Sequence, residues 1–492
     1  MTLEAGDPAF YVRRGYAHVI ANVRGTGASG GTYAFLGPPE PQDGAALVEW
    51  VARQPWCDGN VGMFGISYFG CIQLFVAALN PPHLKCIFCP WASTDQYRDS
   101  FYHGGILNKN WVLSWGRASL HNARYESESL REWGEEAFRA TVEAALRDPD
   151  IAAVPELVQA LRSPREGPLA LIADMLLNSL DGPFWEKRRL KYETIQVPAF
   201  IGADWGQYGL HLPGAFRSWE NLRTPKRMIV GPPASLDRPL YQLQYLSLRW
   251  FDHWLKGKNT GILHDPPVRL FVRGTDSWKT AGDWPLPEAQ WTPFYLHENG
   301  RLWEREHYPS EGYTTFADSP WARGQAEFTS PRLVEETEVI GRIVLNLYAS
   351  STDEDVFWFV SLREVDAAGK ERVLTRGWLR GSHRARDPVR SKPWEPVMAH
   401  TRVEPLAPGE VYEFSIPIKP TATLFKAGSR IKLKIACTDE EPDRAVEPRG
   451  GGHLRRQMPA RVTVYHDERY PSHLLLPITR GNVLGTYLSG GE

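Results

Sequence analysis

Cysteine is scarce in this chain, which has five in 492 residues. Thiols this few and this scattered exclude a disulfide framework. Cys86 and Cys89 have C-x-x-C spacing, but they lie on an apolar run with no second cysteine or histidine pair nearby. We interpret the pair as part of a buried strand rather than a metal or redox site, and we expect no metal and no cofactor.

The chain also lacks an excess of charge of either sign, with a formal net charge of −2 and no basic stripe. This balance gives no support to nucleic-acid binding. The first residues, Met-Thr-Leu-Glu-Ala-Gly-Asp-Pro, have no basic region followed by an apolar run, so they do not resemble a signal peptide. The uncharged stretch 61–82 is long enough for a membrane span, but its glycines and polar residues favour a buried core. We therefore expect a cytoplasmic protein without membrane or nucleic-acid partners.

Apolar content of 42% and charged content of 23% are typical of a soluble globular protein, and the length predicts two or three domains. Strand and helix patterns alternate in the first part of the chain, which favours a parallel sheet with right-handed crossovers. The predicted segments are strand 16–23, helix 43–53, strand 61–64, helix 72–79 and strand 85–89.

The pattern changes twice further along the chain. Residues 94–190 show helical periodicity and no convincing strand, so we expect a helical cap over the strand ends. Strand signals return at 197–203 and 227–231, followed by an aromatic helix at 241–255. Beyond residue 265, short strands separated by Gly, Pro and Asp turns predict a β-sandwich or jelly roll. The predicted domains are an α/β core at 1–95 and 191–264, a cap at 96–190 and a β-sandwich at 265–492.

The most informative stretch is Asn60-Val-Gly-Met-Phe-Gly-Ile-Ser-Tyr-Phe-Gly70, whose pattern predicts a strand, a sharp turn and a helix. A serine on such a turn is typical of the nucleophile elbow of α/β hydrolases, which lifts the hydroxyl clear of the sheet. Ser67 is the candidate nucleophile, and the backbone N–H of Tyr68 would point at the developing oxyanion from the start of a helix. The alternative is a buried corner with an incidental serine. The spacing departs from G-x-S-x-G, because Phe69 takes the place of the second glycine and Gly70 follows it.

Several segments together resemble the cocaine-esterase-like and X-Pro dipeptidyl-peptidase-like hydrolases, often called the CocE/NonD family. They are the elbow with Trp56-Cys-Asp-Gly-Asn60 before it, Arg24-Gly-Thr-Gly-Ala-Ser-Gly-Gly31, Arg249-Trp-Phe-Asp-His-Trp-Leu-Lys-Gly257, Trp284-Pro-Leu-Pro287, and a β region with Gly409-Glu410, Phe425-Lys-Ala-Gly428 and Tyr465-His-Asp467. The resemblance covers nearly the whole chain. It implies an α/β-hydrolase core with an incomplete parallel sheet, a helical cap, a C-terminal jelly roll of the X-Pro dipeptidyl-peptidase type, and serine hydrolysis of esters or amides.

The chain departs from the family pattern at three places. No part of it matches the segment that carries the family's oxyanion tyrosine, and losing one oxyanion donor costs roughly 10²–10³ in rate. The family's acid follows a Trp-Tyr-Asp pattern after the cap, and aligning Trp205 puts Gln207 at that position. Asp204 is the substitute if the loop is rearranged. The family's base stands in Gly-Pro-Trp-Ser-His, where this chain reads Gly231-Pro-Pro-Ala-Ser235.

The base is therefore an open question in the sequence. Ser235 cannot act as a base near neutral pH. His211 is the nearest spare histidine and is the candidate base, with a packed loop histidine as the alternative. His103, where the cap begins, could also reach the site, whereas we interpret His253 on the aromatic helix as structural.

Two functions are compatible with these residues. The first is a serine hydrolase acting on a small-molecule ester or amide. The second is a catalytically degenerate family member that serves as a binding or scaffold protein, whose jelly roll could hold a carbohydrate or another chain. Phe69, Trp91 and Trp205 are the candidate substrate-binding residues, and this aromatic lining favours an apolar or aromatic acyl group. Trp111 and Trp115 are either part of the pocket lining at the cap entrance or ordinary core residues.

A last expectation concerns the edge of the sheet. The strand predicted at 16–23 would leave a long apolar edge, which is a hazard for association. Either another chain covers this edge, such as a second copy in a homo-oligomer, or the true start codon lies upstream. In-frame codons for further strands in the preceding genomic DNA would identify the second case.

Overall fold

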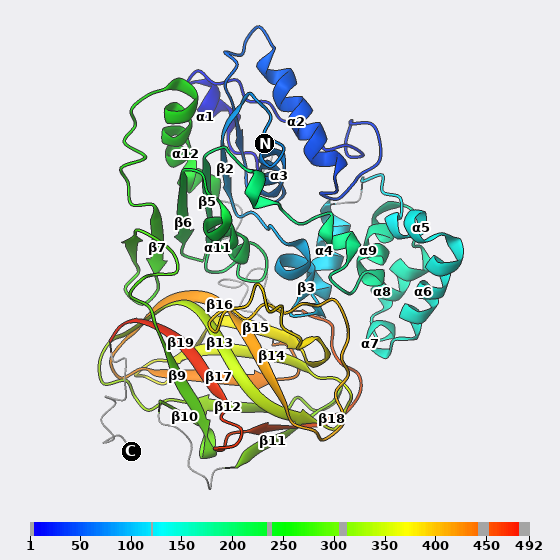
Figure 1. Cartoon of the computed structure of the whole chain (residues 1–492), viewed down its shortest axis with the longest axis vertical. Coiled ribbons are helices and arrows are strands. Elements are labelled where there is room, and N and C mark those ends of the chain that lie inside the picture. The colour runs from blue at the N-terminus through cyan, green and yellow to red at the C-terminus, as the bar shows by residue number, and fades with distance from the viewer. Residues whose placement is uncertain (1–3, 120–121, 234–238, 305–311, 441–451, 482–492) are drawn as a thin grey trace.

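The computed structural model describes residues 4–119, 122–233, 239–304, 312–440 and 452–481. Figure 1 shows an α/β unit at one end of the molecule, a β-sandwich at the other, and a group of helices beside both. The arrangement agrees with the predicted fold class of an α/β-hydrolase core, a helical cap and an all-β C-terminal part.

The α/β unit contains a sheet whose strand order in the described chain is β1-β2-β5-β6-β7-β8. Neighbouring strands from β1 to β7 are parallel, and β8 is antiparallel to β7. The strands are β1 (Val61–Phe64), β2 (Leu84–Pro90), β5 (Ala199–Asp204), β6 (Lys226–Gly231), β7 (Val268–Val272) and β8 (Ser277–Ala281). The helices are α1 (Pro8–Val12), α2 (Pro39–Ala52), α3 (Tyr68–Ala77), α11 (Leu212–Asn221) and α12 (Pro239–Lys256).

Alternate side chains of the central strands pack on opposite faces of this sheet, as the period of two requires. Ile87 and Cys89 of β2 join the cluster that contains α3 and α11 residues, whereas Cys86 and Phe88 join the cluster that contains α12 residues. Both faces are therefore covered by helices, which explains why the strand sequences are apolar throughout.

The core sheet extends further along the chain than the predicted boundary at residue 264. The strand predicted near residue 269 is β7, which pairs in parallel with β6, and β8 then adds an antiparallel edge. A short apolar strand has the same pattern in a sandwich as in a parallel sheet, so the sequence could not assign β7 to its sheet.

The strand predicted at 16–23 does not form. Tyr16 instead joins this segment to α12, because its hydroxyl donates to the Asp252 carboxylate at 2.7 Å and its ring lies 3.7 Å from the Lys256 Nζ. Val19 and Ile20 are more than 40% exposed. No strand of the described chain lies beside this segment to pair with its backbone groups, so an extended ladder has nothing to form against. The edge strand on this side of the sheet is consequently the short β1.

The cap lies between β2 and β5 in the sequence. It opens with a π-helical turn at Tyr97–Phe101 and a small hairpin, and helices follow. Its elements are β3 (Tyr102–His103), β4 (Ile106–Leu107), α4 (Lys109–Ser119), α5 (Glu128–Trp133), α6 (Glu135–Arg147), α7 (Pro149–Ala152), α8 (Pro155–Arg162), α9 (Gly167–Leu177) and α10 (Pro183–Glu186). An aromatic cluster around Phe35, Phe101 and Trp185 joins the cap to the loop before α2.

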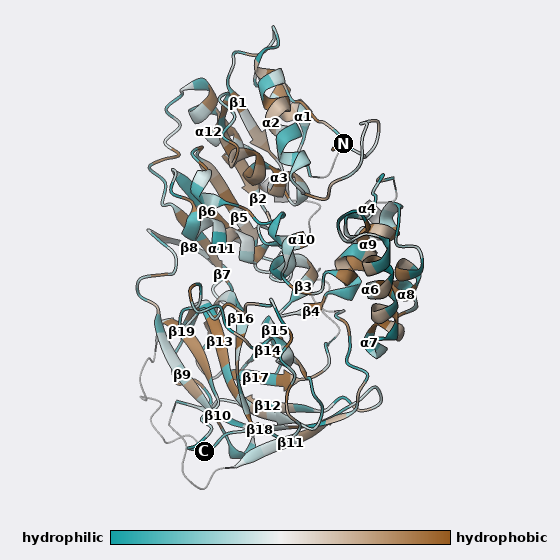
Figure 2. Cartoon of the chain, turned by 45° about the vertical axis from the view of Figure 1, so that its right-hand side comes forward, coloured by the Kyte–Doolittle hydropathy of each residue, from teal (hydrophilic) through white to brown (hydrophobic). Residues whose placement is uncertain are grey.

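The C-terminal part is all β, and its strand pairings close on themselves. The order begins at β11 and ends at β19, and β19 also pairs with β13. Apolar residues concentrate in the strands of this part and in those of the core sheet (Figure 2). The strands are β9 (Gln290–His297), β10 (Arg301–Trp303), β11 (Tyr313–Asp318), β12 (Gln325–Thr329), β13 (Thr337–Ser351), β14 (Phe357–Val365), β15 (Glu371–Arg380), β16 (Tyr412–Phe425), β17 (Arg430–Ala436), β18 (Ala460–Tyr465) and β19 (His473–Arg480).

The apolar stretch at 61–82 forms β1, α3 and the turn after it, as its polar residues predict. Among the described residues, no helix has both the length and the apolar character needed to cross a bilayer.

Candidate active site

Ser67 occupies the sharp turn between β1 and α3, and its backbone adopts φ 56° and ψ −123°. This region is strained for any residue with a Cβ, and such strain is characteristic of a nucleophile elbow. The flanking glycines make the turn possible. A Cβ on Gly65 would lie 2.5 Å from the Phe69 Cβ, and one on Gly70 would lie 3.0 Å from the Pro90 carbonyl oxygen. Gly70 is thus the position where α3 approaches the end of β2, which explains why the second glycine of the motif is displaced by one residue.

The Ser67 side chain is half-buried, and within the described chain its hydroxyl makes no hydrogen bond to another side chain. Tyr68 is the first residue of α3, so its N–H has no acceptor inside the helix. The turn therefore presents a hydroxyl next to an unused backbone donor at a helix N-terminus, where negative charge is stabilised.

Trp91 joins the ends of three strands at this site. The Ser67 N–H donates to the Trp91 carbonyl at 3.0 Å, and the Trp91 N–H donates to the Gly202 carbonyl at 2.7 Å. The Trp91 indole N–H then donates to Asp204 Oδ2 at 2.5 Å. The carboxyl ends of β1, β2 and β5 meet here, so the position of Asp204 is fixed relative to the elbow.

Gln207, at the family's acid position, is fully buried. Neither its amide nitrogen nor its amide oxygen has a hydrogen-bond partner within the described chain. Asp204 stands at the end of β5 and also accepts the Gly206 N–H at 2.8 Å. Ser235, at the family's base position, lies outside the described residues.

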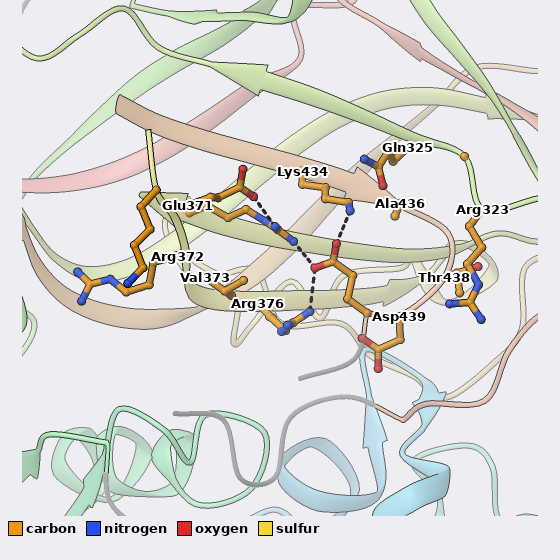
Figure 3. A pocket seen from close by; sticks show the side chains of 14 residues that line it. Arg323, Gln325, Glu371, Arg372, Val373, Arg376, Lys434, Ala436, Thr438 and Asp439 are labelled. Carbon is orange, nitrogen blue, oxygen red and sulfur yellow. Dashed lines mark hydrogen bonds and ion pairs between the residues drawn. The ribbon is translucent and has the colours of Figure 1, made fainter. Parts of the chain in front are cut away.

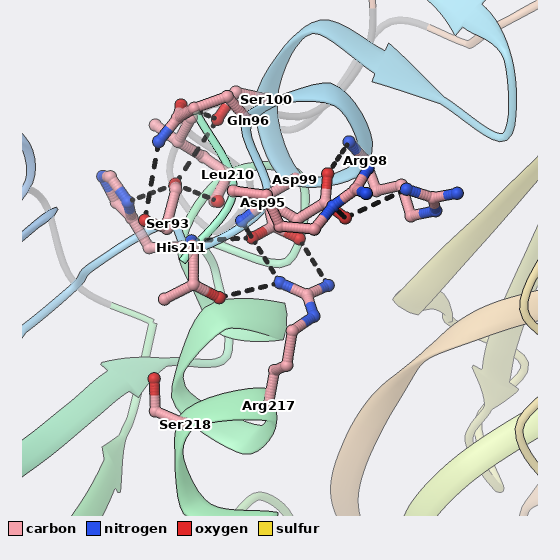
Figure 4. A network of polar contacts seen from close by, with 12 residues as sticks. Ser93, Asp95, Gln96, Arg98, Asp99, Ser100, Leu210, His211, Arg217 and Ser218 are labelled. Atoms are coloured by element: carbon pink, nitrogen blue, oxygen red, sulfur yellow. Dashed lines mark hydrogen bonds and ion pairs between the residues drawn. The ribbon is translucent and has the colours of Figure 1, made fainter. Parts of the chain in front are cut away.

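His211 lies at the start of α11 and is buried. Its Nδ1 is 3.3 Å from the Ser93 hydroxyl, which donates to the Leu210 carbonyl at 2.8 Å (Figure 4). Ser93 in turn follows Trp91 on the loop after β2, so His211 packs beneath that loop. Next to it, the half-buried Arg217 forms an ion pair with the buried Asp99 carboxylate through two hydrogen bonds of 2.7 and 2.9 Å.

The two other histidines weighed from the sequence have structural contacts. His103 is buried, stacks on Trp378 with 4.7 Å between ring centres, and bonds through Nδ1 to His453 Nε2 at 2.8 Å. Burial holds the pKa of His103 well below its usual value. His253 Nδ1 bonds to the Lys258 carbonyl at the end of α12.

A carboxylate that the sequence did not single out lies one side chain away from the elbow. Tyr68 donates its hydroxyl to Glu40 Oε2 at 2.6 Å, and Tyr33 donates to the Tyr68 hydroxyl at 3.0 Å. Glu40 is 2% exposed, and burial raises its pKa to about 7. The contact depends on α2 packing against α3, and no local motif marks it.

The aromatic residues expected to line a pocket have different surroundings. Phe69 is half-buried beside Ser67, whereas Trp205 is 1% exposed and donates its indole N–H to the Phe271 carbonyl on β7. Trp111 and Trp115 stack on each other with 6.2 Å between ring centres, and Trp115 also contacts Phe35. These last contacts belong to the aromatic cluster that joins the cap to the core.

In the described ranges, no group of three or more His, Cys, Asp or Glu side chains is arranged to hold a metal ion. Cys86 and Cys89 lie on β2, where both are buried with free thiols. Burial raises the pKa of each thiol well above its usual value. The interpretation of this pair as buried strand is confirmed.

Two family models match the chain in tandem and together cover most of it. The X-Pro dipeptidyl-peptidase (S15 family) model matches residues 2–234, and the X-Pro dipeptidyl-peptidase C-terminal non-catalytic domain model matches residues 260–475. The chain belongs to the CocE/NonD hydrolase family. Members of this family are serine hydrolases, and the elbow at Ser67 lies within the first match.

Relatives of this CocE/NonD family chain include a protein named as an esterase and one named as a dipeptidyl-peptidase. It is 27% identical to the cocaine esterase of Rhodococcus sp. (strain MB1 Bresler), with 96% of this chain and 89% of that protein aligned. It is 29% identical to the Xaa-Pro dipeptidyl-peptidase of Lactobacillus helveticus (strain DPC 4571), with 88% of this chain and 60% of that protein aligned.

Solved structures agree with the fold. A CocE/NonD family hydrolase from Staphylococcus aureus superposes with a TM-score of 0.78 at 24% identity, covering 97% of this chain and 82% of that one. An α-amino acid ester hydrolase superposes with a TM-score of 0.74 at 17% identity, covering 96% and 87%. At these identities the likeness supports the fold and not a particular substrate.

Proposed function

We propose that this protein hydrolyses ester or amide bonds in small acyl substrates, with Ser67 as the nucleophile. The observation that carries the proposal is the backbone of Ser67, which is held at φ 56° on the turn between β1 and α3. A fold tolerates such strain where the side chain must be presented to a substrate. The hydroxyl is half-buried and is not used by another side chain in the described chain.

In the proposed reaction, the Ser67 hydroxyl oxygen attacks the acyl carbon and its proton passes to a base. The carbonyl oxygen becomes an oxyanion facing the Tyr68 N–H at the start of α3. Collapse of this intermediate releases the alcohol or amine, and water then hydrolyses the acyl-enzyme. We assign the acid and base roles to Asp204, which Trp91 fixes beside the elbow, and to His211 beneath the same loop.

The proposed acyl group is apolar or aromatic. Phe69 and Trp91 flank the nucleophile, and no Arg or Lys occurs in 60–70 or 202–209 to pair with a charged acyl group. Arg98, a cationic residue at the start of the cap, is already bound to Asp95 and Asp181. Esters of benzoate should therefore be hydrolysed faster than half-esters of succinate.

A panel of p-nitrophenyl esters tests the proposal on wild type, Ser67→Ala and a matched control, Ser163→Ala. Ser163 is exposed at the end of α8, so its loss should leave the rate unchanged. Ser67→Ala should lower kcat/KM by at least roughly 10³-fold, because no nucleophile remains. Equal rates from wild type and Ser67→Ala would overturn the assignment, and a preference for the succinate half-ester would overturn the apolar pocket.

A second candidate function is that of a catalytically degenerate binding protein. The observation that favours it is Gln207, a neutral side chain at the family's acid position whose amide is buried without a partner in the described chain. A fluorophosphonate probe separates the two, because it forms a bond to the serine oxygen and releases fluoride only where the hydroxyl is activated. Rapid stoichiometric labelling that is absent from Ser67→Ala supports the hydrolase, and its absence from wild type supports the binding protein.

A further inference from the structure

The β-sandwich contains a cavity of about 660 Å³ that the proposed hydrolysis does not use. Residues of β12, β14, β15 and β17 line it, and Figure 3 labels several of them. Its lining contains three acidic side chains against six cationic ones, which are Arg323, Arg363, Lys370, Arg372, Arg376 and Lys434. A cavity of this size accommodates a small organic molecule.

The floor of the cavity concentrates positive charge in a buried setting. Glu440 binds Arg363 and Lys434 and lies 3.5 Å from Arg376 Nη1, so one carboxylate is shared by three cations. The side chains of these cations are only 5–13% exposed. Charges that are this poorly solvated attract an anion more strongly than charges in water do.

The rim adds two cations that are not engaged. Arg323 and Lys370 are exposed and form no ion pair with any described residue. Neither side chain is needed to complete a salt bridge there, so both are free to contact a ligand that enters the cavity.

One carboxylate oxygen in the lining, Asp439 Oδ1, lacks a hydrogen-bond donor in the described chain. Asp439 Oδ2 accepts from His453 Nδ1 at 2.7 Å, but Oδ1 is buried and has no partner in the described chain. A buried carboxylate oxygen without a donor is unfavourable. A hydroxyl on the ligand would satisfy it.

The cavity also lies where the two large parts of the molecule meet. Arg376 Nε donates to the Tyr208 hydroxyl of the hydrolase core at 3.2 Å, and His453 bonds His103 of the cap at 2.8 Å. Domain junctions are preferred places for ligand sites. The family model for this part of the chain describes it as non-catalytic, so a binding role there is independent of Ser67.

We propose that this cavity binds a small polyvalent anion that also carries a hydroxyl group. The anionic oxygens contact the cations of floor and rim, and the hydroxyl donates to Asp439 Oδ1. Carboxylate and phosphate groups both supply such oxygens, so a hydroxy-tricarboxylate and a sugar bisphosphate are the two probes. Citrate and fructose 1,6-bisphosphate represent them, and tricarballylate, which is citrate without its hydroxyl, is the matched control ligand.

Isothermal titration of the full chain with the three probes tests the proposal. Citrate or fructose 1,6-bisphosphate should bind, and citrate should bind roughly tenfold more tightly than tricarballylate, which is the value of one hydrogen bond. The double variant Arg323→Ala/Lys370→Ala should weaken binding roughly tenfold, because it removes two cations that contact the anion at the rim. Lys426→Ala removes an exposed cation of the same domain outside the cavity and should change nothing.

Asp439→Asn tests the hydroxyl contact separately. The amide oxygen can still accept from His453, but the side chain no longer presents a second carboxylate oxygen to the ligand. The variant should bind citrate and tricarballylate equally well. If neither citrate nor the bisphosphate gives a heat of binding, the cations only stabilise the fold. The same conclusion follows if Lys426→Ala weakens binding as much as the double variant does. A citrate preference that survives Asp439→Asn would overturn the role of Asp439.

Discussion

Two buried glutamines of the hydrolase core have opposite surroundings. Gln73 on α3 donates to the Gly65 and Phe69 carbonyls and accepts the Phe88 N–H, so its amide braces the turn around Ser67. Gln207 is equally buried, yet neither end of its amide has a partner in the described chain. At the scale of single residues, one amide stabilises the elbow and the other costs free energy at the family's acid position.

Replacing Gln207 with Met should raise the free energy of unfolding by about 1–2 kcal/mol. The substitution keeps the volume and removes two buried polar atoms that are not hydrogen-bonded. Urea unfolding followed by tryptophan fluorescence measures it, with Gln73→Met as the control. Gln73→Met should instead lower stability by about 1–3 kcal/mol, because it leaves the Phe88 N–H without an acceptor. A loss of stability in Gln207→Met would show that its amide has a partner in the folded protein.

Glu40 makes stability depend on pH. Burial raises its folded pKa from 4.5 to about 7, so the folded state holds the proton more tightly than the unfolded state does. The contribution is fully present below pH 4.5 and is lost as pH rises through about 7, a change of about 3 kcal/mol. Glu40→Gln should remove this fall in stability between about pH 5 and 7. Glu49→Gln, nearer the surface of the same helix, should keep it.

At the scale of elements, the strand–turn–helix of the elbow is the part most tightly specified by the sequence. Strand 61–64 has the predicted bounds, whereas α3 starts at the residue after Ser67, four residues before the predicted helix 72–79. Small residues leave a single way for α3 to approach the sheet, so local pattern and tertiary packing agree.

Gly65→Ala should disrupt this element. Gly65 has φ 146°, and its new Cβ would lie 2.5 Å from the Phe69 Cβ and 3.0 Å from the Glu4 carbonyl oxygen. Overpacking of this kind costs about 1–3 kcal/mol, and it would shift the start of α3 and slow fluorophosphonate labelling of Ser67. Gly30→Ala is the control, because nothing lies within 4 Å of its added Cβ. Unchanged unfolding and labelling in Gly65→Ala would contradict the crowded turn.

Elements whose formation depends on distant neighbours were predicted less well. The apolar alternation at 16–23 is that of a strand, but without a neighbouring strand in the described chain it runs along α12. Ser129 and Glu132 have the spacing of a capping box, but α5 is capped by Ser127, whose hydroxyl accepts from the Leu130 N–H. The strand pattern at 16–23 and the capping-box spacing at 129–132 are both local signals. Long-range packing decides whether the strand forms and which serine caps the helix.

The same limit applies to the candidate site. The elbow has a sequence motif and was found, whereas Glu40 reaches Tyr68 across 28 residues and was missed. Two hydrogen bonds link Asp439 to His453 and His453 to His103, and the second joins residues 350 positions apart in the sequence. Such contacts exist only once the chain has folded, so spacing in the sequence cannot reveal them.

At the scale of the whole molecule, buried ion pairs join the parts of the chain. Arg98 at the start of the cap binds Asp95 and Asp181 and also donates to the Met398 and Ala399 carbonyls of the β-sandwich. Arg342 on β13 binds Glu220 at the end of α11. The cap, the core and the sandwich are therefore held in one arrangement by charges that are largely shielded from water.

Replacing Arg98 with Met should destabilise this arrangement by about 3 kcal/mol, because it leaves two buried carboxylates short of a cation.

Burial raises the pKa of Asp95, but the charges of Arg98, Arg217 and Arg189 outweigh it and hold that pKa below its usual value. A carboxyl with a depressed folded pKa contributes stability above its unfolded pKa of 3.8, and this is lost as pH falls. Arg98→Met should therefore also unfold at a higher pH in an acid titration followed by circular dichroism. Arg165→Met breaks an exposed pair with Glu135 and should leave both the stability and the acid unfolding unchanged. Equal effects from the two variants would show that the Arg98 cluster is no stronger than a surface salt bridge.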